Sequence, residues 1–545
     1  MPSTIDIRTT EVLVLGGGIA GFRAAVAAAE AGSQVTIVFF ARGASPYIIG
    51  CNAPIAHADG RDTPETYFDD MVRGGYGLND RRLVQLVATE AAAAQQELSA
   101  IGVPFAGADG RLDQRHLSGN TYRRSIYVPE GTGKAILDHL HARARSLGIA
   151  MLPGRKVVRL LQDGPDVVGA LLWERKLGLS AVAAKSVVVA LGGIGRLYED
   201  STYPGDVGCH GYGLALEAGA SLIDMEFVQF EPVVTVWPEA CAGMEMPTGM
   251  LGEGAHLLNA QGERFMFRYN PEHGEKHIEK AKMSLCIQRE IDEGRGFEDR
   301  TVLFDTTVVP REGLESYVSH CKRLRAAGVE PTTVAPRVRP AAHSQMGGVF
   351  IDETGWSGIP GLYVGGETAG GLHGASRLAG NGCSDTLVTG AAAGRGAARA
   401  KGSSADRDWG AAVKRAAEQL DAFVRPGDAR CDEFKRQLRQ VMPKAAGIWR
   451  SGHAAEEGLL RLGELGASLD SVAARDEAEA IEALEASRML TVAKIIVSAV
   501  LARTESRGAH QRTDCPAQDD ANWLQHLSYR LAADGSILQD LTPIH

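Results

Sequence analysis

The sequence predicts an α/β protein in which a Rossmann-type domain is interrupted by an α+β insertion and followed by a helical domain. Residues 10–40 have the pattern of a strand, a glycine turn, an Ala-rich helix and a second strand, which is one βαβ unit. Pro and Gly break the pattern from about 231 to 335, where we expect the insertion. From Trp409 to about Glu505 the chain has few β-branched runs and is predicted to be helical.

The 545 residues are too many for one ordinary core, so several domains are expected. We expect residues 1–230 and 336–402 to form one discontinuous domain, with residues 231–335 inserted in it. Residues 403–515 would form the helical domain and residues 516–545 a C-terminal tail. Helices are also predicted for Tyr67 to Ile101 and, in a small-residue run suited to close packing, for Gly390 to Ala400. A polar linker is predicted at 401–408.

Composition excludes several classes of protein. A formal net charge of -10 and a pI near 5.9 argue against general nucleic-acid binding, which requires a basic face. No apolar run is long enough to span a bilayer, and the first residues lack the regions of a signal peptide. The eight cysteines are scattered without a Cys-x-x-Cys pair, so we expect no zinc or iron–sulfur site and a cytoplasmic protein with reduced thiols.

The N-terminal glycine turn predicts a dinucleotide site. Gly16, Gly18 and Gly21 fit Gly-x-Gly-x-x-Gly between a strand and a helix that opens at Ile19 and Ala20. Such a turn lets the backbone approach a pyrophosphate, whose charge the free N–H groups of the helix start stabilise. The second strand ends in Phe39-Phe40-Ala41-Arg42 without the acid that usually binds ribose, so other groups must do so. Arg42 could favour a 2′-phosphate, although a surface arginine is the simpler interpretation.

Ordered motifs occur along nearly the whole chain. They are Gly192-Gly-Ile-Gly195, Asp224-Met-Glu-Phe-Val-Gln-Phe230, Gly252-Glu-Gly254, His343 with Met346-Gly-Gly348, Gly366-Glu367, His373-Gly-Ala-Ser-Arg-Leu-Ala-Gly-Asn381, and Glu505-Ser-Arg-Gly-Ala-His510 with Asp519-Asp520 and Trp523-Leu524. In these motifs the chain resembles the succinate dehydrogenase/fumarate reductase flavoprotein family, which includes L-aspartate oxidase and soluble fumarate reductases. The resemblance implies a discontinuous FAD-binding domain, an inserted capping domain, a C-terminal helical domain, and hydride transfer between flavin N5 and a small carboxylate.

The resemblance also implies roles for single residues. Arg377 matches the arginine that clamps a substrate carboxylate, for which a guanidinium fork is suited, and His343 matches a histidine that holds substrate. Glu367 matches the acid that binds the ribityl chain. The other positions expected at the cofactor are Gly192, Gly193, Asn381, Gly382 and Ser384, together with Arg377.

Several positions depart from the family pattern. Glu231 stands where the family has a substrate-binding histidine, Thr248 where it has an acid, and Leu251 where it has an arginine. The proton-shuttling arginine is also missing, and an ungapped count back from Glu290 places Lys280 at its position. Lys280 could serve as the proton relay if burial lowers its pKa. Lys282 and Arg289 lie nearby, and any of the three could instead be an exposed helix residue.

These departures suggest an unusual substrate. Glu231 adds a negative charge to a site built for carboxylates, so we expect an amino, cationic or neutral polar substrate group to face it. The expected substrate is therefore a small carboxylate, either succinate/fumarate-like or an amino-carboxylate. The segment that attaches FAD covalently in some relatives has Tyr47 nearest the expected position and His57 too far along, so FAD is predicted to be non-covalent.

Two other functions stay open at this point. The chain could be the flavoprotein subunit of a complex that passes electrons to an iron–sulfur partner, since it has no cluster motif of its own. It could also be a degenerate flavoprotein that no longer catalyses, although retention of Arg377 and His343 argues against that.

Overall fold

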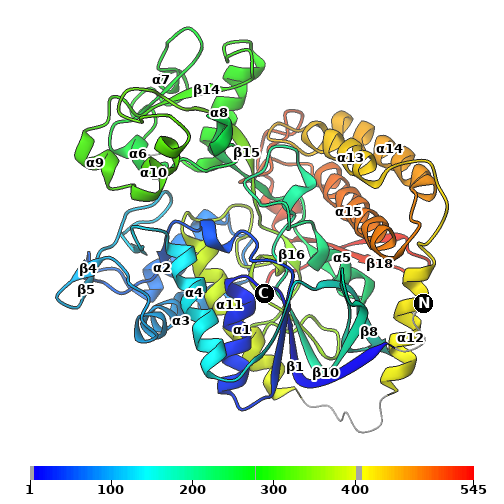
Figure 1. The fold of residues 1–545 in the computed structure, drawn as a ribbon. Helices are drawn as coiled ribbons and strands as arrows, with labels where there is room; N and C mark the ends of the chain where they lie inside the picture. The colour runs from blue at the N-terminus through cyan, green and yellow to red at the C-terminus, as the bar shows by residue number, and fades with distance from the viewer. Residues whose placement is uncertain (1–4, 277, 401–407) are drawn as a thin grey trace.

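The computed structural model describes residues 5–276, 278–400 and 408–545 (Figure 1). Its main sheet has the order β7-β2-β1-β10-β9-β8, with β17 also paired to β10. Strand β1 runs parallel to both β2 and β10, so the predicted βαβ unit is present. The strands of the sheet are β1 (Asp6–Leu15), β2 (Val35–Phe39), β7 (Ala150–Pro153), β8 (Lys156–Asp163), β9 (Asp166–Glu174), β10 (Gly178–Val189) and β17 (Leu362–Val364).

Helices α1 (Ile19–Glu30), α4 (Thr132–Ser146) and α11 (Asn381–Arg399) lie together beside this sheet (Figure 1). The small-residue helix predicted near 390–400 is the second half of α11. Its glycines let α11 touch the backbone of α1, because a Cβ at Gly394 would lie 2.2 Å from the carbonyl oxygen of Ala24. This contact joins two segments more than 350 residues apart and keeps the two parts of the FAD-binding domain in one body.

The region predicted to be helical from Tyr67 to Ile101 is two helices, α2 (Pro64–Gly74) and α3 (Arg81–Ala100). The break occurs because Tyr76 and Gly77 have φ angles of 56° and 79°, which a right-handed helix cannot include. Asp80 then caps α3 by accepting a hydrogen bond from the backbone N–H of Arg82.

The inserted region forms a separate body, here called the cap, which lies over the FAD-binding domain (Figure 1). Its sheet has the order β12-β15-β14-β13 and its own apolar core, as expected for an α+β insertion. Strand β12 starts in the FAD-binding domain and strand β15 ends in it, so these two strands connect the cap to that domain. Its elements are β12 (Val228–Trp237), α6 (Gly249–Gly252), β13 (His256–Leu258), α7 (Met266–Tyr269), α8 (Lys280–Asp292), β14 (Val302–Asp305), α9 (Arg311–Glu315), α10 (Val318–Ala326) and β15 (Arg337–Gln345).

The C-terminal region is helical, as the sequence predicts, and three of its helices pack together beside the cap (Figure 1). Its helices are α12 (Trp409–Asp421), α13 (Cys431–Ala445), α14 (Gly452–Ser468) and α15 (Glu477–Ala502). The linker predicted at 401–408 lies outside the described residues except for Asp408, whose side chain caps α12 by accepting from the N–H of Ala411. Among the described residues no helix combines the length and hydropathy that crossing a membrane requires.

The segment 516–545, expected as a tail, is built into the fold. Its strands complete a second sheet in the order β16-β11-β18-β19. The strands of this second sheet are β11 (Leu222–Ile223), β16 (Gly348–Val349), β18 (His526–Leu531) and β19 (Ile537–Thr542).

The remaining elements are mostly short. They are β3 (Cys51–Asn52), β4 (Gly107–Ala108), β5 (Arg111–Leu112), β6 (Ser125–Ile126), α5 (His210–Glu217), α16 (Asp520–Trp523), and single 3₁₀ turns at Ser45–Tyr47, Gly195–Leu197, Glu239–Cys241, Gly366–Thr368 and Leu469–Ser471.

The contact between α1 and α11 gives a direct stability prediction. Gly394→Ala should lower the free energy of unfolding by about 1–3 kcal/mol, because its new methyl group overlaps the backbone of Ala24. Gly463→Ala is the matched control: Gly463 lies in α14 with nothing within 4 Å, so alanine should stabilise by roughly 0.5–1 kcal/mol through helix propensity. Thermal midpoints of the two variants should move in opposite directions, and an unchanged midpoint for Gly394→Ala would contradict the packing argument.

Candidate functional site

A cavity of about 1720 Å³ runs from the glycine turn after β1 to the underside of the cap. It follows the carboxyl ends of β1, β2 and β10, where open α/β sheets bind their ligands. The FAD-binding domain, the cap and the helical domain all contribute to its walls. Its size and mixed lining are those of a site for a large cofactor with a small substrate beside it.

The glycine turn has the shape that a dinucleotide requires. Gly16 has a φ of 130°, and a Cβ there would lie 2.0 Å from the carbonyl oxygen of Ala190. The backbone N–H of Ile19 donates to the Ser45 hydroxyl at 2.9 Å, at the N-terminus of α1. Gly16, Gly18 and Ala20 line the cavity, whereas Ile19 and Gly21 are buried behind it. The turn therefore forms a cradle without side chains, into which a pyrophosphate fits.

The end of the cavity near β2 lacks the usual ribose-binding acid, as the sequence indicates. Arg42 does not replace it with a free cation, because its guanidinium lies 3.0 Å from a carboxylate oxygen of Asp138. Two acids that sequence reasoning missed line this end instead. Asp206 accepts from the N–H of Gly43 at 3.1 Å, and Glu485 reaches the cavity from α15. No local motif could reveal them, since both come from distant parts of the chain.

Glu367 lies on the wall of the cavity. One of its oxygens accepts hydrogen bonds from the N–H of Gln345 at 2.9 Å and from the hydroxyl of Tyr203. Burial raises the pKa of this carboxyl. A Cβ at Gly193 would lie 2.3 Å from the carboxylate, which explains the glycine there. Gly192 lines the cavity itself.

Asn381 and Ser384, expected at the flavin ring, turn their side chains away from the cavity. The side-chain Oδ1 of Asn381 accepts from the side-chain amide of Asn52 at 2.6 Å and from the Tyr67 hydroxyl at 2.8 Å. The Ser384 hydroxyl donates to the backbone oxygen of Asn52 at 2.7 Å. Both side chains thus fasten β3 to α11 behind the wall, while Gly382 lines the cavity. Their role toward the cofactor stays a prediction.

Under the cap the structure brings together three of the four predicted catalytic residues. The Lys280 ammonium lies 2.5 Å from a carboxylate oxygen of Glu231 and 3.0 Å from one of Glu245. His343 lies 3.9 Å from the same Glu231 oxygen and is hydrogen bonded to Thr202 at 3.0 Å. The Glu231 side chain has no exposure to solvent, whereas Lys280, Glu245 and His343 line the cavity. Lys280 therefore stands between a buried carboxyl and the open space.

The charges of this cluster follow from burial and proximity. Burial, with the nearby Glu245, raises the pKa of Glu231 to about 8, so Glu231 is mainly protonated at neutral pH. Although burial opposes it, Lys280 and His343 lower the pKa of Glu245 to about 2. Burial would lower the pKa of Lys280, but the two carboxyls outweigh it and raise that pKa. Burial, with Arg377 and Lys280, lowers the pKa of His343 to about 3 and keeps its imidazole neutral.

The added acid at Glu231 is thus balanced inside the protein. The cluster holds one ammonium, one carboxylate and one protonated carboxyl, and it does not carry the extra negative charge that the sequence suggested. Glu245, which supplies the carboxylate, was missed because it belongs to no motif. It reaches the cluster through an antiparallel bridge with Val234 on β12, a pairing that only the folded cap shows.

Arg377, the fourth predicted residue, lines the cavity and forms no ion pair with any described residue. Its Nε is buried without a hydrogen-bond partner, so the guanidinium is available to an anion. The other two relay candidates lie elsewhere: Lys282 is exposed, and Arg289 stacks on Trp449 at 5.0 Å. Thr248 lines the cavity, whereas Leu251 is buried in the core of the cap.

These features define a dinucleotide-binding oxidoreductase with an anion site beside its cofactor cavity. A family model described as "FAD binding domain" matches residues 11–383, and one described as "Fumarate reductase flavoprotein C-term" matches residues 435–541. The chain belongs to the FAD-dependent oxidoreductases of the succinate dehydrogenase/fumarate reductase flavoprotein family, and it binds FAD.

Relatives in this family span nearly the whole chain. It is 34% identical to a fumarate reductase (CoM/CoB) subunit of Methanothermobacter marburgensis, over 94% of this chain and 95% of that one. It is 32% identical to the L-aspartate oxidase of Caulobacter vibrioides, over 93% and 94%. The FrdA chain of an E. coli quinol fumarate reductase variant superposes with a TM-score of 0.91 and 27% identity, over 99% of this chain and 97% of that chain.

The carboxyl pair predicts a distinctive pH dependence of stability. The pKa of Glu231 is higher in the native state than its ordinary value of 4.5, so the native state binds more protons between pH 4.5 and about 8. Stability from this group is therefore present at low pH and lost as the pH rises through 8. Glu231→Gln, which mimics the protonated carboxyl, should match the parent near pH 4, gain stability relative to it as the pH rises above 4.5, and be more stable by about 3–5 kcal/mol at pH 9.

Thermal unfolding at several pH values measures this difference. The matched control is Glu298→Gln, which removes an exposed carboxyl from the cap and should shift both ends of the pH range equally. A stability difference between Glu231→Gln and the parent that is the same at pH 6 and pH 9 would show that Glu231 is ionised throughout.

Proposed function

We propose that this protein exchanges hydride between FAD and a small carboxylate, with Lys280 as the group that delivers or accepts the accompanying proton. When bound, FAD supplies the hydride chemistry at its N5 atom. The observation that carries the proposal is the position of Lys280, which lies in the cavity wall with its ammonium against Glu231 and Glu245. Lysine at this point restores a cationic proton donor where the family arginine is missing.

Arg377 and the residues of the cluster under the cap would each have a separate role. Arg377 would hold one substrate carboxylate through its unpaired guanidinium, and neutral His343 would offer a ring nitrogen to the substrate. Lys280 would give its proton to the substrate carbon, and the protonated carboxyl of Glu231 behind it would return one, at a contact of 2.5 Å. The raised pKa of Lys280 disfavours its neutral amine. Return of a proton from Glu231 keeps this neutral form short-lived and so assists the transfer to substrate.

The FAD would be held by the glycine cradle of Gly16 and Gly18 for its pyrophosphate and by Glu367 for its ribityl chain. We infer that the attachment is non-covalent. His57 accepts from the N–H of Leu112 at 2.9 Å and lines a different cavity. Tyr47 lines the cofactor cavity but offers no imidazole.

The substrate that the site favours is a C4 dicarboxylate of the succinate/fumarate type. Glu231 is protonated and Lys280 balances the ionised Glu245, so no cationic substrate group is needed for charge balance. An amino-carboxylate is the second candidate, because the ionised Glu245 lines the cavity and could hold an ammonium group. The similarity to an L-aspartate oxidase supports the same alternative.

We also propose that the protein works in a complex with an electron-transfer partner, in the cytoplasm. The Methanothermobacter relative, which matches the chain over nearly its whole length, is by its name one component of a larger enzyme. This supports a role as the flavoprotein of a larger complex, and we propose an iron–sulfur protein as its electron partner because the sequence has no cluster motif of its own. All eight cysteines are free and six are buried, as expected for reduced thiols in a cytoplasm.

Anaerobic reoxidation tests the function. The FAD-loaded protein is reduced with dithionite, and fumarate should reoxidise the flavin. Lys280→Met should slow this at least about 100-fold, the usual contribution of a general acid, while the exposed neighbour Lys282→Met should react at the parental rate. Reoxidation of Lys280→Met at the parental rate would exclude the proposed proton donor. No reaction with fumarate, together with flavin reduction by L-aspartate, would select the amino-carboxylate.

Denaturation tests the attachment of the cofactor. After unfolding in acid or detergent and ultrafiltration, all of the flavin should pass into the filtrate, because no histidine of the segment near Tyr47 faces the cavity. Flavin fluorescence that stays with the protein band on a denaturing gel would show a covalent bond instead.

A further inference from the structure

The two residues before Lys280 are fastened to the FAD-binding domain. The Tyr76 hydroxyl donates to a carboxylate oxygen of Glu279 at 2.8 Å, and the Ser118 hydroxyl donates to the backbone oxygen of Ile278 at 3.2 Å. Both donors belong to the FAD-binding domain, and both acceptors belong to the cap. Because Lys280 is the first residue of α8, its position depends directly on where this segment is held.

The Glu279 side chain bonds to Tyr76 and does not cap the helix that it precedes. It occupies the N-cap position of α8, where a short polar side chain would normally accept from the first backbone N–H groups. Its side chain makes no such bond and reaches the Tyr76 hydroxyl instead. We call the hydrogen bond between Tyr76 and Glu279 the latch.

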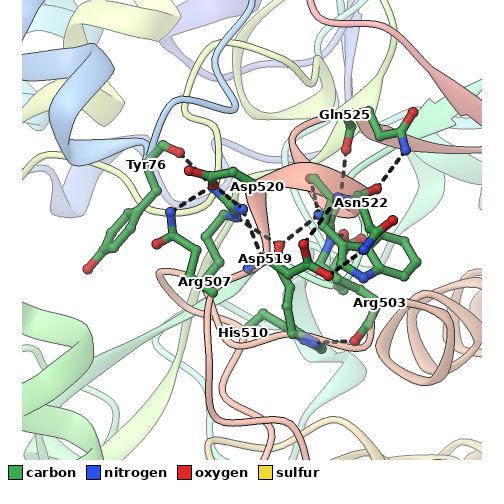
Figure 2. A network of polar contacts seen from close by, with 12 residues as sticks. Tyr76, Arg503, Arg507, His510, Asp519, Asp520, Asn522 and Gln525 are labelled. Atoms are coloured by element: carbon green, nitrogen blue, oxygen red, sulfur yellow. Dashed lines mark hydrogen bonds and ion pairs between the residues drawn. The ribbon is translucent and has the colours of Figure 1, made fainter.

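Tyr76 is held firmly enough to act as the fixed side of the latch. Its φ of 56° is uncommon for a residue other than glycine and persists only where neighbours enforce it. The buried Arg507 does so by donating to the Tyr76 carbonyl oxygen at 3.1 Å, while it also binds Glu505 and Asp520 (Figure 2). Figure 2 shows the Tyr76 ring directed away from this ionic network.

The loop that carries Tyr76 also contacts the segment of the anion site. The N–H of Ala375 donates to the carbonyl oxygen of Gly75 at 3.0 Å, only two residues before Arg377. The Tyr76 ring packs against a small apolar cluster that includes Ala375 and Phe227. One rigid loop therefore contacts the substrate-clamping segment on one side and the proton-relay segment on the other.

We propose that Tyr76 is a positioning residue whose hydroxyl, acting through Glu279, holds Lys280 at the carboxyl pair and in register with Arg377. The proposal rests on the proposed role of Lys280. Other contacts join the cap to its neighbours, such as Arg115 over the ring of Tyr317 at 5.2 Å and Arg289 over Trp449 at 5.0 Å. Neither contact involves residues 278–280, so losing the latch should disturb the proton step and leave the cap in place.

Tyr76→Phe removes the hydroxyl and keeps the ring. In the FAD-loaded protein it should lower kcat about three- to tenfold with KM within twofold, since proton delivery and not carboxylate binding is affected. Amide hydrogen exchange over 280–286 should rise by a similar factor. Glu279→Ala should reproduce both effects, and Glu279→Gln, which keeps an acceptor oxygen, should recover at least half of each. Tyr529→Phe is the matched control, because it deletes a tyrosine hydroxyl that is bonded to Gln539 within the second sheet and not to the cap.

The latch further requires that Tyr76→Phe combined with Glu279→Ala be no worse than either change alone. Additive losses, or unchanged exchange over 280–286 in Tyr76→Phe, would overturn it. The two proposals fail in different ways. If Lys280→Met reacts normally, the proton donor is wrong, yet the exchange measurement still decides whether the latch holds this segment.

Discussion

A carboxyl group without access to water must be protonated or paired, and the candidate site is arranged around that requirement at Glu231. Strand β12 places Glu231 opposite Ala341 on β15, two residues before His343. Helix α8 adds Lys280, and the chain returns along β12 to add Glu245. Since no one of these elements balances the charge alone, folding the base of the cap and assembling the chemistry of the site are the same process.

A second buried ionic network supports the root of the same strand. Arg503 is fully buried, binds the side chain of Glu226 and lies 3.1 Å from Glu505. Glu226 lies just before β12, and Arg507 in the same network holds the carbonyl of Tyr76. The C-terminal segment 503–510 thus holds both the root of the strand that carries Glu231 and the loop that carries Tyr76. Breaking a buried pair of this kind leaves an uncompensated charge, so the network must stay complete for the cap to be seated.

The sequence predicted the fold class, the glycine turn, the helical C-terminal region and the close contact of the small-residue helix. Of its four catalytic candidates, Lys280, Glu231 and His343 lie together, and Arg377 lines the same cavity. The charge argument from sequence was incomplete, because it counted Glu231 as unpaired and had no means of finding Glu245. The contact of Lys280 with both carboxyls leaves the cluster without the excess negative charge on which the expectation of a cationic substrate group rested.

The sequence by itself determined where a dinucleotide can bind, because a glycine turn and its flanking strand and helix are local features. Only the tertiary structure decided the protonation of Glu231, the partner of Lys280 and the role of Tyr76. Those properties arise from burial and from contacts between residues 14 to more than 400 positions apart, such as Glu231 with Glu245 and Tyr76 with Arg507. Solvent exclusion and charge proximity act through space, and spacing along the chain does not encode them.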